Sequence, residues 1–378
     1  MTGAAGRGSQ VLFYVSGHGL GHASRDAEVI HRMARLEPRL SVGVRSTAQP
    51  WIFNRTNHRV PIALTHVEID TGVAQIDSIR LDEDETARRA RDFYRDFDRR
   101  ADAEAAAIRA SGAKVVVGDI PPLAFEAAAR AGVRSVALAN FTWDWIYEGY
   151  SSFASIAPEV IPIIRQAYGT TTSALRLPLH GGFDSMRAVI CDIPFIARHA
   201  NRPREETRTL LNLGHDTIVA LASFGGHGVD LPYADIARSS RFTILLTDYE
   251  QRDTSGPENL RRVPMNWLAD RDIQYADLVA ASDVVVSKPG YGIVSECLAN
   301  GPALLYTDRG RFREHDVFVE EMPRLLRCRH ISQDDLRAGR WNDAIEALLA
   351  QDPPPQRVAT NGADAAARMI LDVESTLQ

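Results

Sequence analysis

The chain has 378 residues, 45% of them apolar and 24% charged, so its length suits two domains that each bury a core. Its 43 Lys and Arg residues are outnumbered by 49 Asp and Glu, and the net charge of −6 argues against a nucleic-acid or membrane-surface binder. Three cysteines without CxxC spacing indicate neither a disulfide framework nor a cysteine zinc site, which fits a reducing cytoplasm.

The first half of the chain alternates short apolar runs with helical stretches. Residues 11–15 form a β-rich run that passes through the glycine-rich segment 16–22 into an amphipathic stretch at 23–36. Further strands are expected at about 41–45, 63–69, 114–118 and 134–139, with helices at about 85–111 and 122–132. This alternation predicts a mostly parallel sheet covered by helices.

The same pattern begins again near residue 217. A strand at 217–223 is followed by the glycine loop 224–228, and more strands are expected at about 242–247, 260–263, 283–286 and 303–306. We therefore expect an α/β protein with domains at 1–198 and 199–378, whose last helix, at about 361–376, has the length to pack back on the first domain. Ligands of such sheets bind beyond the carboxyl ends of the strands, here in a cleft between the domains. No run is long enough to span a membrane, which leaves peripheral membrane contact open.

The strongest local motif is residues 284–302, where an apolar strand ends in a loop that contains Gly290 and Gly292. The glycines let backbone N–H groups approach a ligand, and the positive end of the following helix faces the loop, as a diphosphate would require. Glu296 lies one turn into that helix, within reach of a ribose. The alternative is an ordinary strand-turn-helix connection in which Glu296 complements the helix dipole.

The loop at 16–22 carries two histidines, His18 and His22. Its glycines are spaced GxGxG rather than GxGxxG, which disfavours a nicotinamide enzyme. A histidine at a strand end can take a proton from a hydroxyl if a carboxylate orients it. Asp119 ends a neighbouring strand, so we expect it to orient His18, with His22 as the reserve base. The alternative is that either histidine caps the helix or packs in the core.

An aromatic segment at 141–153 holds six aromatic residues and follows a predicted strand. It would border the cleft of the first domain and offer stacking faces for a sugar or hold an apolar acceptor tail. Core packing or a dimer contact explains the same residues. The expected acceptor-binding residues are Gly19, Asn140, Trp143 and Trp145.

Residues 16–22, and residues 287–302 followed by 306–308, resemble the first-domain glycine loop and the donor-site signature of GT-B glycosyltransferases of the family 1 and family 28 type, which include the bacterial cell-wall N-acetylglucosaminyltransferase. Three stretches, 14–25, 118–122 and 288–296, are most similar to a subgroup that is also found as the amino-terminal domain of plant L-arabinokinases. The resemblance implies two Rossmann-like domains that face each other across a cleft. It also implies a nucleotide-sugar donor on the second domain, a hydroxyl acceptor on the first, and neither a metal nor a further cofactor.

The resemblance implies that Glu296 binds the donor ribose and that Gly226, Ser287, Gly290 and Gly292 line the diphosphate. Where many relatives hold sugar hydroxyls with an acidic residue and Gln, this chain has Arg-Glu-His-Asp at 313–316. The complete expected donor-binding set is Gly225, Gly226, His227, Ser287, Lys288, Gly290, Tyr291, Gly292, Ser295, Glu296, Arg313 and Asp316.

The sequence thus predicts a bacterial, cytoplasmic enzyme that transfers a hexosyl or N-acetylhexosaminyl group from a nucleotide diphosphate sugar to a hydroxyl acceptor. Lys288, one of only two lysines in the chain, is expected to stabilise the departing diphosphate. Two alternatives stay open: a non-hydrolysing nucleotide-sugar epimerase, and a non-catalytic sugar-nucleotide-binding domain. The sequence decides neither the stereochemistry of transfer nor the oligomeric state.

Overall fold

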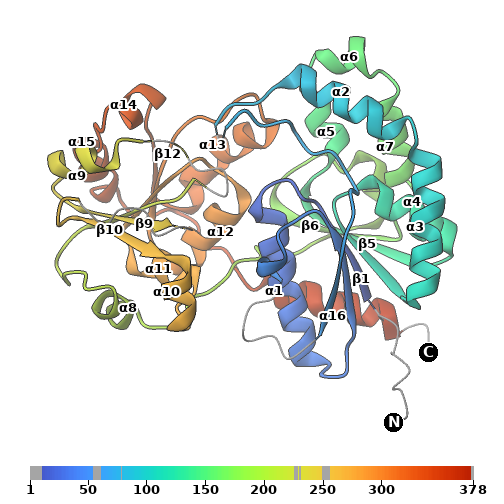
Figure 1. The fold of residues 1–378 in the computed structure, drawn as a ribbon, viewed down its shortest axis with the longest axis horizontal. Coiled ribbons are helices and arrows are strands. Elements are labelled where there is room, and N and C mark those ends of the chain that lie inside the picture. Colours follow the sequence, from blue (N-terminus) through green and yellow to red (C-terminus); the bar gives the residue numbers. More distant parts are fainter. Residues whose placement is uncertain are drawn as a thin grey trace.

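The computed structural model describes residues 11–53, 61–77, 79–224, 229, 231–248 and 256–375. Two parallel sheets, one of seven strands and one of six, each form the centre of a helix-covered domain (Figure 1). The predicted α/β architecture with two parallel-sheet domains is confirmed.

The first sheet has the strand order β3-β2-β1-β4-β5-β6-β7. Its strands are β1 (Val11–Val15), β2 (Val42–Ser46), β3 (Ile62–His66), β4 (Val115–Asp119), β5 (Arg134–Phe141), β6 (Ser173–Gly181) and β7 (Ile190–Asp192). Its α-helices are α1 (Leu20–Leu36), α2 (Glu83–Tyr94), α3 (Phe97–Ser111), α4 (Pro122–Ala131), α5 (Trp143–Tyr147), α6 (Ser152–Ile156) and α7 (Val160–Tyr168), and two 3-10 turns lie at Pro50–Ile52 and Asp184–Val189. The single helix expected at 85–111 is two helices, because Asp96 leaves the helical conformation and starts α3.

The second sheet has the order β10-β9-β8-β11-β12-β13. Its strands are β8 (Val219–Ala222), β9 (Thr243–Asp248), β10 (Leu260–Pro264), β11 (Val284–Ser287), β12 (Ala303–Tyr306) and β13 (Cys328–His330). The helices of this half are α8 (Arg204–Leu210), α9 (Tyr233–Ser239), α10 (Met265–Asp270), α11 (Tyr275–Ala281), α12 (Tyr291–Asn300), α13 (Arg313–Leu325), α14 (Gln333–Arg337) and α15 (Asn342–Leu349).

The central strands are buried along their whole length, since helices cover both faces of a parallel sheet. Every residue of β1, β4, β8, β11 and β12 is buried, which explains why these strands read as continuous apolar runs. Glycines lie at the start of one helix and at the end of another. Gly19 precedes α1 with a φ of 76°, and Gly301 ends α12 with a φ of 96°, both conformations that side chains with a Cβ rarely adopt.

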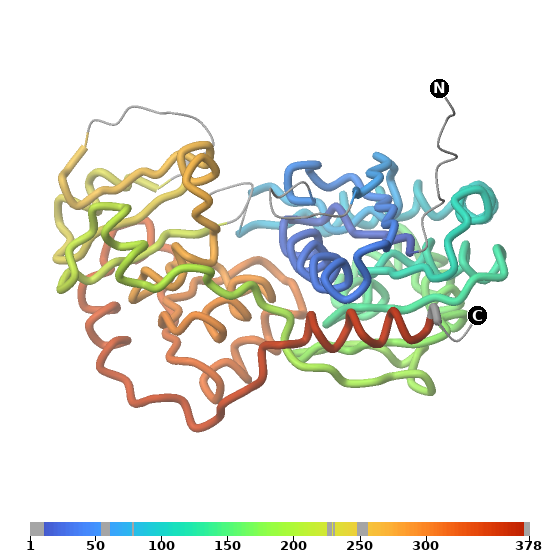
Figure 2. Tube along the Cα trace, turned by 90° about the horizontal axis from the view of Figure 1, so that it is seen from below, coloured from blue at the N-terminus to red at the C-terminus, as the bar shows by residue number. Residues whose placement is uncertain are grey.

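The last helix, α16 (Gly362–Ser375), leaves the second half of the chain and lies against α1, β4 and β5 of the first sheet (Figure 2). Its buried face consists of Ala363, Ala366, Ala367 and Ile370. The small alanines permit close packing, so the end of the chain joins the two halves of the molecule. No helix in the described part of the chain is long and apolar enough to cross a membrane.

Candidate active site

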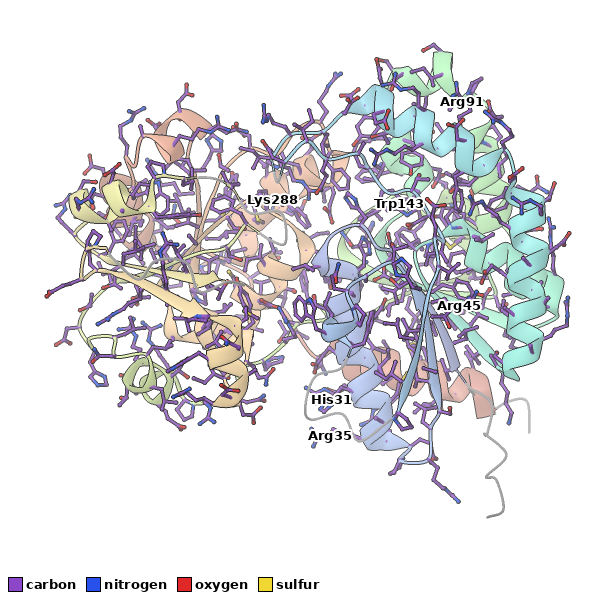
Figure 3. All side chains as sticks on the ribbon, in the orientation of Figure 1. His31, Arg35, Arg45, Arg91, Trp143 and Lys288 are labelled. Carbon is purple, nitrogen blue, oxygen red and sulfur yellow. The ribbon has the colours of Figure 1, made fainter. Side chains whose placement is uncertain are left out.

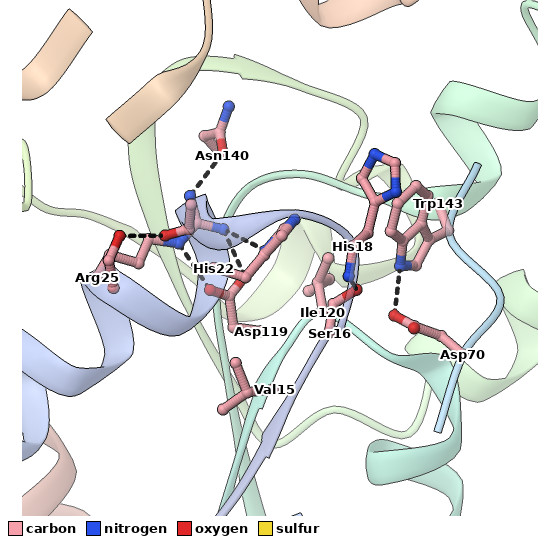
Figure 4. A network of polar contacts seen from close by, with 12 residues as sticks. Val15, Ser16, His18, His22, Arg25, Asp70, Asp119, Ile120, Asn140 and Trp143 are labelled. Atoms are coloured by element: carbon pink, nitrogen blue, oxygen red, sulfur yellow. Dashed lines mark hydrogen bonds and ion pairs between the residues drawn. The ribbon is translucent and has the colours of Figure 1, made fainter. Parts of the chain in front are cut away.

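His22 and Asp119 meet where β1 and β4 end (Figure 4). Val15 pairs with Asp119 in parallel register, so both strands deliver their next residues to the same edge of the sheet. Gly19 then turns the chain into α1, which places His22 in the first turn of the helix. His22 Nδ1 lies 2.9 Å from Asp119 Oδ1, and both side chains are buried.

Arg25 holds the other side of the Asp119 carboxylate. Its Nε donates to Asp119 Oδ2 at 2.7 Å, and its Nη2 also contacts Oδ1. Burial alone would raise the pKa of Asp119, but the charges of Arg25 and His22 outweigh burial and hold this pKa below its usual range. Arg25 Nη2 also lies 3.0 Å from His22 Nδ1, so this nitrogen meets a donor as well as the carboxylate. In the tautomer whose Nδ1 proton points to Asp119, Nε2 is left as a proton acceptor.

The sequence prediction that Asp119 orients His18 is wrong. His18 Nδ1 instead accepts the backbone N–H of Val73 at 3.4 Å, and the His18 ring contacts Trp143 edge-on with 5.5 Å between centroids. The reason is geometric, because the chain turns into α1 after His18 and carries the second histidine over the carboxylate. Figure 4 shows the two rings near each other, with His22 above Asp119 and His18 beside Trp143.

A cavity of about 560 Å³ opens beside His18 in the first domain. It lies between the loop after β1, the segment after β3, and the helices α2 and α3. Its lining residues are Gly17, His18, Gly19, Thr47, Glu68, Asp70, Thr71, Val73, Gln75, Arg89, Asp92, Phe93 and Arg100. Of the expected acceptor residues, Gly19 alone belongs to this lining.

Asp70, which sequence reasoning missed, is a second acid at this site. Trp143 Nε1 donates to its Oδ2 at 3.1 Å. Burial raises the pKa of Asp70 to about 6, although the Ser16 hydroxyl and the charge of His22 oppose this shift. Asp70 follows β3 by four residues, so the strand-end argument applied to Asp119 could have found it.

The remaining expected acceptor residues do not face the cavity. Trp143 has no exposed surface, so the prediction that it offers a free stacking face is wrong. Asn140 is also fully buried and accepts a hydrogen bond from Arg25 Nη1 at 2.8 Å. Trp145 is partly buried under the Arg313 guanidinium, whose Cζ lies 4.8 Å from the ring centroid. The aromatic segment packs between the sheet and its helices, as the core-packing alternative holds.

The glycine loop of the second domain faces the histidine loop of the first. A Cβ on Gly292, in the first turn of α12, would lie 3.8 Å from the Gly21 Cα. Lys288 lies in this loop at the edge of the second domain that faces the first (Figure 3). Its ammonium has no hydrogen bond or ion pair among the described residues, and burial followed by the charge of Arg309 lowers its pKa to about 7.

The hydroxyls expected to bind the donor are engaged within the protein. Ser287 donates to the Lys288 carbonyl at 2.9 Å, and Ser295 donates to the Gly292 carbonyl at 2.9 Å. Tyr291 accepts the backbone N–H of Ile196 at 3.0 Å. Buried polar groups need such partners, so these three residues shape the loop in this arrangement.

Glu296 is buried and ion-paired with Arg198, whose chain segment precedes α8. The Arg198 guanidinium also lies 5.5 Å above the ring of Tyr275. The carboxylate expected to bind a ribose is therefore already neutralised by a cation. A ribose hydroxyl would have to share this carboxylate with Arg198.

Glu314 connects the two domains. Asn140 Nδ2 donates to Glu314 Oε1 at 2.7 Å, and Arg309 Nη1 approaches Glu314 Oε2 at 3.2 Å and the Pro289 carbonyl at 3.4 Å. Because Asn140 also accepts from Arg25, hydrogen bonds and ion pairs run from the His22 dyad to the loop that contains Lys288. Neither Arg309 nor Glu314 belonged to the predicted set of site residues.

Arg313 and Asp316 both lie in the first turn of α13, the helix that carries Glu314. Arg313 Nη1 donates to the Trp145 carbonyl at 2.8 Å and so reaches into the first domain, while Asp316 is exposed. The expected donor residues Gly225, Gly226 and His227 lie outside the described residues. Within the described ranges, no three His, Cys, Asp or Glu side chains gather as metal ligands.

No protein-family model matches the chain. Solved structures show its fold. The calicheamicin glycosyltransferase CalG4 aligns over 98% of both chains with a TM-score of 0.64 and 16% identity. UGT2 of Phytolacca americana, complexed with UDP-2fluoro-glucose and pterostilbene, aligns over 96% of this chain and 94% of its own with a TM-score of 0.59 and 12% identity. The chain therefore has a GT-B glycosyltransferase-like fold, as its sequence motifs predicted.

A curated plant protein is similar in sequence as well. L-arabinokinase of Arabidopsis thaliana is 28% identical over 372 residues, which is 95% of this chain. The chain spans about a third (34%) of the length of that relative.

Proposed function

We propose that the protein is a metal-independent glycosyltransferase that moves a sugar from a nucleoside diphosphate donor to a hydroxyl acceptor. The observation that carries this proposal is the buried His22–Asp119 pair, which lies at the strand edge opposite the glycine loop of the second domain. Asp119 fixes the imidazole through Nδ1 and stabilises the cation that forms, while Nε2 removes the acceptor proton. His22 thus replaces His18 as the proposed base.

The second domain supplies the groups that a diphosphate needs. The N-terminus of α12 and the ammonium of Lys288 carry positive charge at one loop, and neither depends on a metal. Arg309 adds a second buried cation beside this loop. The structural neighbour complexed with UDP-2fluoro-glucose supports uridine diphosphate as the first nucleotide to test.

The proposed reaction is a single displacement. The acceptor hydroxyl loses its proton to His22, its oxygen forms a bond to the anomeric carbon, and the bond from that carbon to the diphosphate oxygen breaks. The electron pair leaves with the diphosphate, where Lys288 and the α12 N-terminus stabilise the charge. One displacement inverts the anomeric configuration.

The test begins with thermal-shift measurements on uridine, thymidine, guanosine and adenosine diphosphates and their sugars, because a bound ligand raises the melting temperature. With the responding donor, release of nucleoside diphosphate is then measured over a mixture of sugar and phenol acceptors. His22→Ala should lower kcat by about 10²- to 10⁴-fold, the usual contribution of a general base. Product anomers are identified by NMR.

His18→Ala is the matched control, since the ring of this neighbouring histidine contacts Val73 and Trp143, while the ring of His22 contacts Asp119. Near-normal turnover in His22→Ala together with its loss in His18→Ala would return the role of base to His18. Survival of activity in both variants contradicts a histidine base. Conversion of the donor without any acceptor would indicate the epimerase alternative.

A further inference from the structure

The cavity beside His18 has an unusual composition for a small-molecule site. Ligand pockets are lined mostly by apolar and aromatic side chains. Here Val73 and Phe93 are the only large apolar residues in the lining. Five charged side chains accompany them, namely Glu68, Asp70, Arg89, Asp92 and Arg100.

The aromatic residues that could bind an apolar acceptor are not available to the cavity. Trp143, Tyr147 and Phe153 are at most 1% exposed and stack on one another beneath the site. An apolar ring or a lipid tail would therefore have to lie against charged groups and strip them of water, which costs free energy without a compensating contact.

Asp70 is held in place at the cavity. Trp143 Nε1 fixes one carboxyl oxygen at 3.1 Å, so the orientation of the group is set before a ligand arrives. Burial raises its pKa to about 6, and near neutral pH the carboxylate accepts hydrogen bonds from hydroxyl groups.

Arg100 supplies donors to the cavity from α3. Its guanidinium lies over Phe93, with Cζ 4.2 Å from the ring centroid, and pairs with Glu68 at 3.2 Å. Its Nε is buried without a hydrogen-bond partner. A planar guanidinium fixed in this way presents its N–H groups in a rigid fork, which suits two neighbouring hydroxyl oxygens.

We propose that this cavity binds a polyhydroxylated acceptor, a free mono- or oligosaccharide or a related polyol, through Asp70 and Arg100. A carboxylate acceptor and guanidinium donors in the lining of one cavity match a ligand whose every hydroxyl both donates and accepts. This inference deepens the proposed function and rests on it in one respect: the sugar is called an acceptor because the protein is proposed to transfer a group to it. Binding of the sugar itself does not depend on transfer.

The experiment measures binding of D-glucose, L-arabinose, N-acetylglucosamine and maltose by saturation-transfer NMR, with 4-methylumbelliferone as the apolar comparison. Asp70→Asn and Arg100→Met should each weaken binding of the responding sugar by about tenfold or more, because each removes hydrogen bonds between the sugar and a charged group. Arg99→Met is the matched control, because Arg99 neighbours Arg100 on α3 but is exposed and lies outside the lining. The melting temperature of each variant without ligand reports whether its fold is intact.

Sugar binding that is lost in both cavity variants and kept in Arg99→Met supports the proposal. Binding of 4-methylumbelliferone but of no sugar overturns it, as does sugar binding that neither Asp70→Asn nor Arg100→Met weakens. If sugars bind as expected while no nucleotide raises the melting temperature, the proposed transferase function fails and the polyol site stands.

Discussion

Replacement of Glu314 by alanine tests whether the buried contacts between the domains stabilise the molecule. The Glu314 side chain is buried near the start of α13, where it neutralises Arg309 and accepts from Asn140. Its removal leaves a buried guanidinium without a counter-charge and a buried amide N–H without an acceptor. Breaking a buried ion pair in this way typically costs about 3–5 kcal/mol. We expect Glu314→Ala to lower the free energy of unfolding by about this amount.

The same helix offers a matched control. Glu321 lies 3.2 Å from Arg324, the same separation as in the Arg309–Glu314 pair, but Arg324 is exposed and Glu321 is only half-buried. Exposed pairs contribute only about 0.2–1 kcal/mol, because water screens the charges and the side chains lose entropy. Glu321→Ala should therefore change the free energy of unfolding by less than about 1 kcal/mol.

Urea unfolding followed by tryptophan fluorescence and far-UV circular dichroism measures the free energies, and small-angle scattering of the native variants reports any separation of the domains. The double variant Arg309→Met/Glu314→Met should recover most of the loss, because it removes both charges and keeps apolar volume. Equal effects of Glu314→Ala and Glu321→Ala, with unchanged scattering, would refute the reasoning.

Three further predictions concern ionisable groups. Asp26 is fully buried with both oxygens unpartnered, and burial, reinforced by the charge of Asp119, raises its pKa well above normal. The folded state therefore binds the extra proton, so stability falls as pH rises from the unfolded pKa of about 4 towards the folded value, by up to about 1.4 kcal/mol per pH unit. The melting temperature of Asp26→Asn relative to the parent protein should rise from pH 5 to pH 8, and a constant difference would contradict this sign. Lys288→Arg should weaken uridine diphosphate binding roughly tenfold in calorimetry, because a bulky guanidinium crowds the loop, whereas Lys114→Arg should not; equal affinities would contradict the role of Lys288. In the parent protein this affinity should fall from pH 6 to pH 8 as Lys288 loses its proton with a pKa of about 7, and Lys288→Met should lack that change.

Much of the fold follows from local pattern. The buried strands are apolar runs, and glycines and prolines mark where the helices begin and end, so β1, β4, β8, β11 and β12 could be found directly. Strand β6 was missed because Arg176, Pro178 and His180 interrupt its apolar pattern. Strand β6 can carry these residues because it lies next to the end of the sheet. Beyond it there is only β7, a strand of three residues.

The site could be predicted in part. The rule that parallel strands bring their carboxyl ends together placed the histidine loop beside Asp119. It did not decide between the two histidines, because that choice depends on the turn at Gly19 and on the first turn of α1. Arg25 lies three residues after His22, on the same helix face, and this spacing was the available signal for its contact with the same carboxylate.

The contacts between the domains lie beyond any local pattern. Asn140 and Glu314 are 174 positions apart, and only the packed arrangement brings them within 2.7 Å. Hydrogen bonds by way of Asn140 and Arg25 also connect Glu314 to the Asp119 carboxylate, which orients His22. The orientation of the proposed base therefore depends on a residue of the opposite domain. This dependence follows from burial, since each group in the series has lost water and must be satisfied by its neighbours.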